Sequence, residues 1–156
     1  MVKARKNWAP RDRDDAYAEL DHPADLFLEV RGGDLPTLFA NALFALYDQL
    51  AGLDGFEARC EWTVAVQTPC LAEALRALLA EALYRFETDG LVAIGAEVTV
   101  QTTATGDVHA VAELHGDKVD RRHHTLLTEV KAVTYHLLAV DAAPGGGWRA
   151  TVLLDV

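Results

Sequence analysis

Asp21-His22-Pro23-Ala24-Asp25, followed by Leu26-Phe27-Leu28-Glu29-Val30, is the stretch around which this chain is organised. The even-numbered residues of the second half are all aliphatic, and this alternation predicts a strand. The first half is a polar turn at the start of that strand. Its two aspartates offer hard oxygen ligands of the kind that hold Ca²⁺ or Mg²⁺. A plain turn is the alternative interpretation, because Asp and Pro are frequent turn residues.

The bulk properties describe an acidic globular chain. Its 156 residues fit one domain with a sizeable core. Lysine and arginine number 14 against 24 aspartates and glutamates, for a net charge of -10. We therefore expect no direct tight binding of nucleic acid, since phosphate neutralisation supplies most non-specific affinity. A cation or a basic protein partner fits this charge better. No apolar run is long enough to cross a membrane and no secretory signal precedes the domain, so a cytoplasmic protein is expected.

The first half of the sequence predicts a tail and two helices. Residues 1–15 are polar and of mixed charge, which predicts a disordered tail. Apolar residues at helical spacing over residues 35–50 predict a helix, and Asp34 is well placed as its N-cap. A second amphipathic helix is predicted from Thr68-Pro69 to Asp89-Gly90, with Thr68 as its cap and Pro69 at its first position.

The second half is predicted to be mostly strand. Val98–Thr102 and 108–114 alternate, Gly116-Asp117 is predicted to be a turn, and residues 130–140 and 148–156 complete the strands. The fold class is therefore α+β, a largely antiparallel sheet packed with two amphipathic helices. We expect residues 16–156 to form a single domain.

The last strand ends in a carboxylate. Asp155 follows three aliphatic residues, with only Val156 after it. If this strand end meets the front turn, then Asp25, Asp155 and the main chain of Val156 form an all-oxygen site for a hard cation. An exposed terminal aspartate without a ligand role is the alternative.

Other reactive residues do not form a recognisable catalytic motif. Arg121-Arg122-His123-His124 offers groups for a phosphate or a metal, but a solvated loop explains it better. Cys60 and Cys70 have no metal-type spacing and are expected to be reduced. No phosphate-binding glycine loop or nucleophile elbow is present. The sequence therefore does not indicate a self-contained enzyme.

Six blocks, taken in order, resemble the archease family from about residue 17 to the end. Pro23 replaces the usual Thr, and Thr37 stands where the family often has Glu. The matching blocks are Asp21-His22-Pro23-Ala24-Asp25, Gly33-Asp34-Leu35, Phe86-Glu87-Thr88-Asp89-Gly90-Leu91, Asp120 with Arg122-His123, Glu129-Val130-Lys131-Ala132-Val133-Thr134-Tyr135-His136, and Asp155-Val156.

The resemblance implies an accessory protein rather than an enzyme. The implied partner is an RtcB-type RNA ligase, which joins RNA ends in tRNA splicing and RNA repair. Members of the family promote guanylylation of that ligase and support its multiple turnover. The family's metal positions correspond to Asp25, Asp155 and the Val156 main chain, for a divalent cation (Ca²⁺, Mg²⁺ or Mn²⁺). Asp21, Asp34 and Lys131 match other positions that the family uses to activate its partner.

Two other functions remain open at this point. A free-standing metal-dependent phosphoesterase would use the same carboxylates and would turn over a substrate alone. A chaperone-like binding module would carry its ion incidentally, and its activity would survive the loss of Asp25 or Lys131.

Overall fold

The computed structural model describes residues 6–156. Three helices, two 3-10 turns and eight strands follow one another along this part of the chain. They are η1 Pro10–Asp12, α1 Arg13–Ala16, β1 Tyr17–Leu20, β2 Leu26–Gly32, α2 Leu35–Leu50, η2 Leu53–Gly55, β3 Cys60–Thr68, α3 Leu71–Asp89, β4 Leu91–Thr102, β5 Val108–Lys118, β6 Ala132–Val133, β7 Ala139–Ala142 and β8 Trp148–Asp155.

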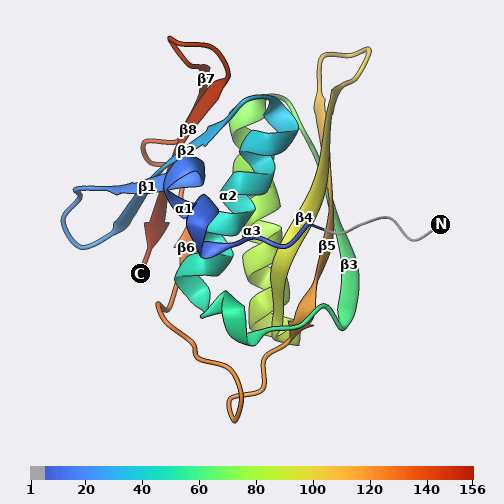
Figure 1. The fold of residues 1–156 in the computed structure, drawn as a ribbon. Helices are drawn as coiled ribbons and strands as arrows, with labels where there is room; N and C mark the ends of the chain where they lie inside the picture. The colour runs from blue at the N-terminus through green and yellow to red at the C-terminus, as the bar shows by residue number, and fades with distance from the viewer. Residues whose placement is uncertain (1–5) are drawn as a thin grey trace.

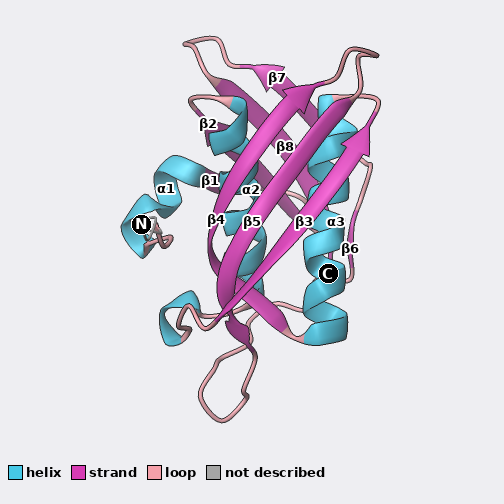
Figure 2. Cartoon of the chain, turned by 90° about the vertical axis from the view of Figure 1, so that its right-hand side faces the viewer, coloured by secondary structure: helices cyan, strands magenta, loops and turns pink. Residues whose placement is uncertain are grey.

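Two antiparallel sheets enclose the two long helices. One sheet has the order β1-β2-β8-β6, with β7 also pairing with β8, and the other has the order β3-β5-β4. Figure 1 shows α2 and α3 side by side between the sheets, and Figure 2 shows the long β3-β5-β4 sheet covering one side of the helices. The predicted α+β class is confirmed, but the strands form two sheets rather than one.

Helix α2 is buried on both sides because a sheet lies on each. Its faces carry a nearly continuous set of buried residues from Leu38 to Leu50. The predicted cap is confirmed: the Thr37 backbone N–H donates to Asp34 Oδ1 at 2.8 Å. Because this bond needs only a backbone N–H at residue 37, the threonine there does not remove it.

Helix α3 begins later than its sequence predicts. Cys70 holds the N-cap position, without a side-chain hydrogen bond, and Leu71 is the first helical residue. Thr68 therefore is not the cap; its hydroxyl instead donates to the Cys70 carbonyl at 2.8 Å. The C-terminal end agrees with the prediction, since Gly90 closes the helix in the left-handed conformation with φ of 70°.

The prediction of a disordered tail over residues 1–15 is corrected for the residues that the structure describes. Residues 10–16 form η1 and α1, and the Trp8 backbone N–H donates to the Ile94 carbonyl at 2.8 Å. The Trp8 ring also stacks on Phe44, with ring centroids 5.4 Å apart. Composition alone missed this segment because its attachment depends on contacts with distant residues, including the stacking of Trp8 on Phe44. Residues 1–5 lie outside the described residues.

Two predictions in the second half are wrong. Residues 116 and 117 lie inside β5 rather than in a turn. The region 130–140 is not one strand: β6 and β7 are separated by a turn at residues 134–138, in which Leu137 has a positive φ of 58°. An apolar run signals burial or pairing, but it does not reveal where the chain reverses.

Both cysteines are free thiols, Cys60 partly buried and Cys70 exposed. Within residues 6–156, no helix combines the length and the apolar character that crossing a bilayer requires.

Candidate functional site

The ends of two paired strands bring Asp25 and Asp155 to one edge of the sheet. Strands β2 and β8 are antiparallel, with Leu26 opposite Leu154. Asp25 and Asp155 are the next residues outward on the two strands, so both lie at this end of the sheet. Figure 1 shows the β1–β2 turn and the C-terminus on the same side of the molecule. We call Asp21, Asp25, Asp155 and Val156 the acidic corner.

The turn that carries the first two aspartates is held by local contacts. His22 Nδ1 lies 3.7 Å from Asp25 Oδ2 and 3.2 Å from the Pro23 carbonyl oxygen. Ala24 adopts a positive φ of 66°, which is unusual for a residue with a Cβ. The turn therefore has a defined shape, with Asp21 exposed and Asp25 half-buried.

Strand β6 flanks the other side of the last strand at the same edge. Ala132 lies opposite Asp155, and the Lys131 backbone N–H donates to the Asp155 carbonyl at 2.7 Å. Lys131 and Asp155 are both exposed. The structure thus places Lys131 next to the acidic corner.

His136, which the sequence placed in a strand, reaches this corner as well. Its ring centroid lies 6.4 Å from that of His22, edge to face. Because the turn at residues 134–138 joins short strands, sequence periodicity could not locate it. The shared block from Glu129 to His136 was the only signal that grouped it with Lys131.

Asp34 is not part of the acidic corner. It lies two residues after Gly32, at the opposite end of β2 from Asp25, and a seven-residue strand spans about 23 Å. Its carboxylate caps α2. Hydrogen bonds from Thr37 lower the pKa of Asp34, and the bond from the side chain has a larger effect than the bond from the backbone.

We expect the loss of this cap to reduce stability. Asp34→Ala should lower the free energy of unfolding by about 1 kcal/mol, and the melting temperature by about 3 °C for a chain of this size. Because the folded pKa is lowered, the contribution is complete above the unfolded pKa and is lost as pH falls through the folded value. Thermal unfolding at neutral and acidic pH measures both effects.

Asp34→Ser provides the matched control, because serine also caps helices. Its melting temperature should stay near that of the wild type and should lose the dependence on acidic pH that Asp34 contributes. An equal loss of stability in the Ala and Ser variants would contradict a capping role.

The donor set of the acidic corner suits a hard divalent cation. Its predicted ligands are the carboxylates of Asp25 and Asp155 and the main-chain oxygens of Val156, all of them oxygen ligands. Across residues 6–156, no three His, Cys, Asp or Glu side chains are grouped so that they could hold an ion together. A cation at this corner therefore depends on the main-chain oxygens as well as on Asp25 and Asp155.

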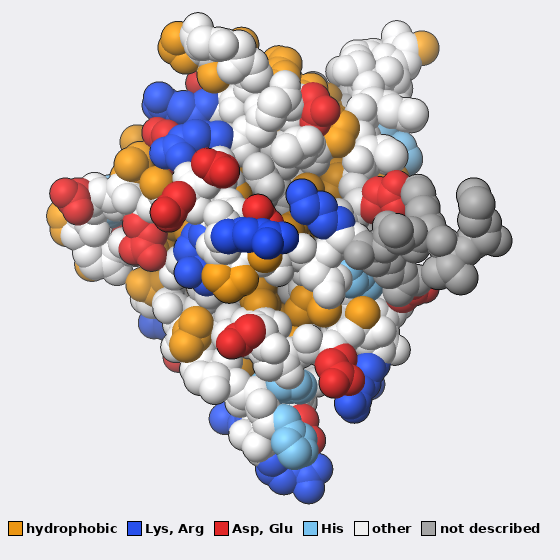
Figure 3. All heavy atoms as spheres, viewed as in Figure 1, with side chains coloured by type: hydrophobic (Ala, Val, Ile, Leu, Met, Phe, Trp, Pro, Cys, Tyr) orange, Lys and Arg blue, Asp and Glu red, His pale blue; other side chains and the backbone are white. Residues whose placement is uncertain are grey.

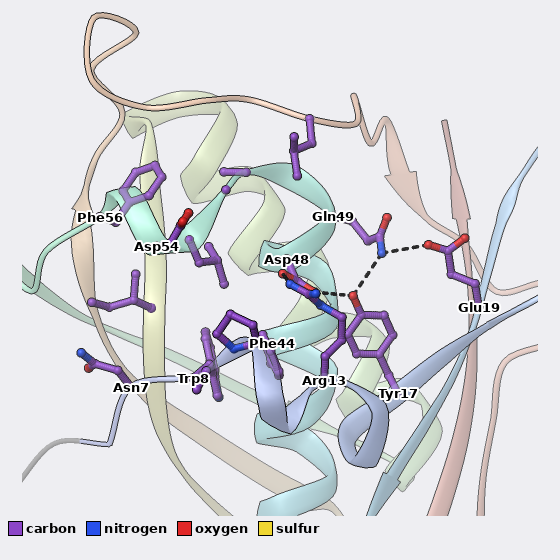
Figure 4. Close-up of a pocket in the computed structure, with 17 residues that line it drawn as sticks. Asn7, Trp8, Arg13, Tyr17, Glu19, Phe44, Asp48, Gln49, Asp54 and Phe56 are labelled. Atoms are coloured by element: carbon purple, nitrogen blue, oxygen red, sulfur yellow. Dashed lines mark hydrogen bonds and ion pairs between the residues drawn. The ribbon is translucent and has the colours of Figure 1, made fainter.

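A cavity lies elsewhere, between the N-terminal segment and α2. Its cavity volume is about 650 Å³. Figure 4 shows that its polar groups bind one another: Arg13 Nη2 donates to Asp48 Oδ1 at 2.9 Å, and Asp48 also accepts from the Tyr17 hydroxyl. Burial raises the pKa of Tyr17. These groups attach the N-terminal segment to α2 and are not free to hold a substrate.

The loop that joins β5 to β6 is basic and separate from the acidic corner. Lys, Arg and His side chains gather at the lowest point of Figure 3, where Figure 1 draws this loop, whereas acidic side chains gather at the β1–β2 turn. Arg122 pairs with Asp120, and its hydrogen bonds lower the pKa of that carboxyl. The His124 ring stacks on Phe56 with centroids 3.7 Å apart. His124 therefore packs against Phe56, and its Nδ1 accepts a hydrogen bond from the Asp120 backbone N–H at 2.8 Å.

Together these features define a class: a sandwich of two sheets around two helices, with an exposed carboxylate corner where the last strand meets the first turn. The profile of the "Archease protein family (MTH1598/TM1083)" matches residues 17–156. The chain therefore belongs to the archease family.

Individual relatives agree with this assignment. Protein archease of Methanosarcina mazei is 31% identical over 140 residues, which cover 90% of this chain and 95% of the relative. Protein archease of Methanopyrus kandleri is 33% identical over 141 residues, covering 90% and 99%. The solution structure of Methanobacterium thermoautotrophicum protein 1598 has a TM-score of 0.79 at 25% identity, covering 90% of this chain and 99% of that one.

Proposed function

We propose that this protein activates an RtcB-type RNA ligase, promoting guanylylation of the ligase and its multiple turnover in tRNA splicing and RNA repair. Family membership supports an accessory role. The observation that carries the proposal is the pairing of Leu26 with Leu154, because it brings the aspartates next to them to one edge. The protein would act in the cytoplasm as a protein cofactor, not as an enzyme.

In this proposal, the acidic corner holds a divalent cation, Ca²⁺, Mg²⁺ or Mn²⁺. Asp25, Asp155 and the Val156 main chain would be its ligands. When bound, the ion supplies positive charge that can neutralise phosphate oxygens of a nucleotide. Lys131 adds a second positive charge beside the carboxylates, and Asp21 lies exposed on the same corner. Asp34 would support activation through the stability of α2.

The charge of the protein supports a protein partner over direct binding of RNA. A net charge of -10 repels phosphates and attracts the basic surface that an RNA-binding ligase presents. The carboxylates at the acidic corner would therefore meet the nucleotide site of the ligase, and not the RNA.

The test is covalent guanylylation of the purified ligase with labelled GTP, with and without this protein. We expect a faster guanylylation step, and ligation that continues past one turnover per ligase only when this protein is present. No change in either rate would exclude the proposal.

Two further arms address the other candidate functions. Turnover of a nucleotide or phosphodiester by this protein alone would favour the phosphoesterase. Full stimulation by both Asp25→Asn and Lys131→Ala would favour the chaperone-like module.

A further inference from the structure

A small apolar surface adjoins the acidic corner. Tyr135 and Leu137 are 65% and 47% exposed, and both lie in the turn between β6 and β7. We call residues 134–138 the Tyr135 turn. Large apolar side chains that stand together in water are a common mark of interaction sites. Tyrosine and arginine are also the residues most enriched where binding energy concentrates.

The Tyr135 turn is held in a fixed shape. The Thr151 hydroxyl donates to the Leu137 carbonyl at 2.7 Å, and the Leu138 backbone N–H donates to the Tyr135 carbonyl at 3.3 Å. Leu137 keeps a positive φ of 58°, a conformation that is costly for a branched side chain. A strained, exposed leucine contributes little to the core, so a role in binding accounts for it better.

Arg76 packs against one face of the exposed Tyr135 ring. The Arg76 guanidinium carbon lies 4.1 Å from the centre of the Tyr135 ring, and Arg76 Nη1 donates to the Val133 carbonyl at 3.3 Å. Its Nε is buried without a hydrogen-bond partner, and Arg76 forms no ion pair with another residue in the range 6–156. This arrangement orients the ring before any partner arrives, which reduces the entropy lost on binding.

Two contacts bring the turn close to the acidic corner. Thr134 anchors the start of the turn on β8, because its backbone N–H donates to the Leu153 carbonyl at 3.0 Å. Leu153 is two residues before Asp155. At the other side, His136 and His22 place their rings edge to face with centroids 6.4 Å apart. A partner that receives the acidic corner therefore also meets the Tyr135 turn.

The surrounding charges decide which partner fits. Asp21, Asp25 and Asp155 lie on the adjoining acidic corner, and the net charge of -10 of the whole chain repels the phosphates of an RNA strand. A second copy of this chain would bring the same carboxylates face to face, because a two-fold interface joins a surface to itself. A basic protein surface with an apolar recess would bind the acidic corner and the Tyr135 turn together.

We propose that the Tyr135 turn is the docking element for the ligase, and that Tyr135 and Leu137 enter an apolar recess beside the ligase's nucleotide site. This inference rests on the proposed function and adds a binding surface distinct from the cation ligands. The turn supplies affinity, and the acidic corner supplies activation.

The variants for the test separate binding from folding. Leu137→Gly removes the exposed side chain at a positive φ that glycine adopts freely, so the fold is retained. Tyr135→Ala removes the ring, and Tyr135→Phe keeps it. Tyr84→Ala is the matched control, because Tyr84 is 57% exposed on α3, eight residues or about 12 Å along the helix from Arg76.

Each purified full-length variant is titrated onto the ligase for its Kd and then assayed for guanylylation at saturating concentration. We expect Leu137→Gly and Tyr135→Ala to weaken binding by at least about tenfold, with the saturated rate unchanged. Tyr135→Phe and Tyr84→Ala should bind within about twofold of the wild type, a difference well under 1 kcal/mol.

The outcomes distinguish this inference from the function on which it rests. If the wild type stimulates the ligase while Leu137→Gly and Tyr135→Ala bind as tightly as the wild type, the docking inference alone is overturned. If the wild type neither binds nor stimulates the ligase, both proposals fail. Sedimentation that shows a wild-type dimer dispersed by Leu137→Gly would also overturn the inference, because the turn would then bind a second copy.

Discussion

Asp155→Asn should reduce the stimulated rate of ligase guanylylation to the rate of the ligase alone. The substitution keeps the size of the side chain and removes the charge that a hard cation requires. Even an outer-shell partner of a metal contributes about 10- to 100-fold to affinity, and a ligand carboxylate contributes at least as much. The measurement is the single-turnover rate of guanylylation at saturating variant.

The fold should tolerate this change. Asp155 is exposed, and its main-chain carbonyl, not its carboxylate, accepts the hydrogen bond from Lys131. Thermal unfolding should therefore match that of the wild type. Higher concentrations of the divalent cation should restore part of the stimulation, because the remaining oxygens of the corner still bind it weakly.

Asp141→Asn is the matched control. Asp141 lies in β7 opposite Arg149, near the other end of β8, so the same chemical change occurs in the same sheet but away from the acidic corner. It should stimulate the ligase as the wild type does. Stimulation by Asp155→Asn equal to that of Asp141→Asn would exclude a cation held by Asp155 from the mechanism.

The strands of the acidic corner were predictable because their signals are local. Alternation over residues 26–30 and the aliphatic run before Asp155 each predict a strand end that carries a carboxylate. The pairing of Leu26 with Leu154 joins residues 128 positions apart, and no local pattern encodes such a partner. The shared blocks suggested that the two ends meet, and the register of β2 with β8 supplies the physical link.

Contacts between distant segments account for what the sequence did not predict. Trp8 attaches a polar segment to the core by stacking on Phe44. The Tyr135 turn has its shape because Thr151, from another strand, binds the Leu137 carbonyl. Gly116 was predicted to be a turn residue, because glycine and aspartate together usually mark one. Such residues are explained only by what lies across from them in space.

Gly116→Ala is expected to destabilise the fold more than any other substitution considered for this chain. Gly116 lies within β5, opposite Cys60 and Ala93, where the register with β4 shifts before Gly95. A Cβ at Gly116 would lie 1.9 Å from the Val92 carbonyl oxygen and 2.8 Å from the Ala93 Cα. Both atoms belong to the backbone of β4, so no side-chain rotation can relieve the clash.

The backbones of the neighbouring strands β4 and β5 must therefore separate to admit one methyl group. Overpacking a core typically costs about 1–3 kcal/mol, and we expect at least the upper end here because backbone obstructs the group. A loss of about 3 kcal/mol corresponds to a fall of about 9 °C in melting temperature for a chain of this size. Denaturant unfolding gives the free energy of unfolding directly.

Gly145→Ala is the control, because its Cβ would meet nothing within 4 Å, and its stability should stay the same or rise by up to about 1 kcal/mol. A loss below about 1 kcal/mol for Gly116→Ala would mean that β4 and β5 approach less closely at this bulge.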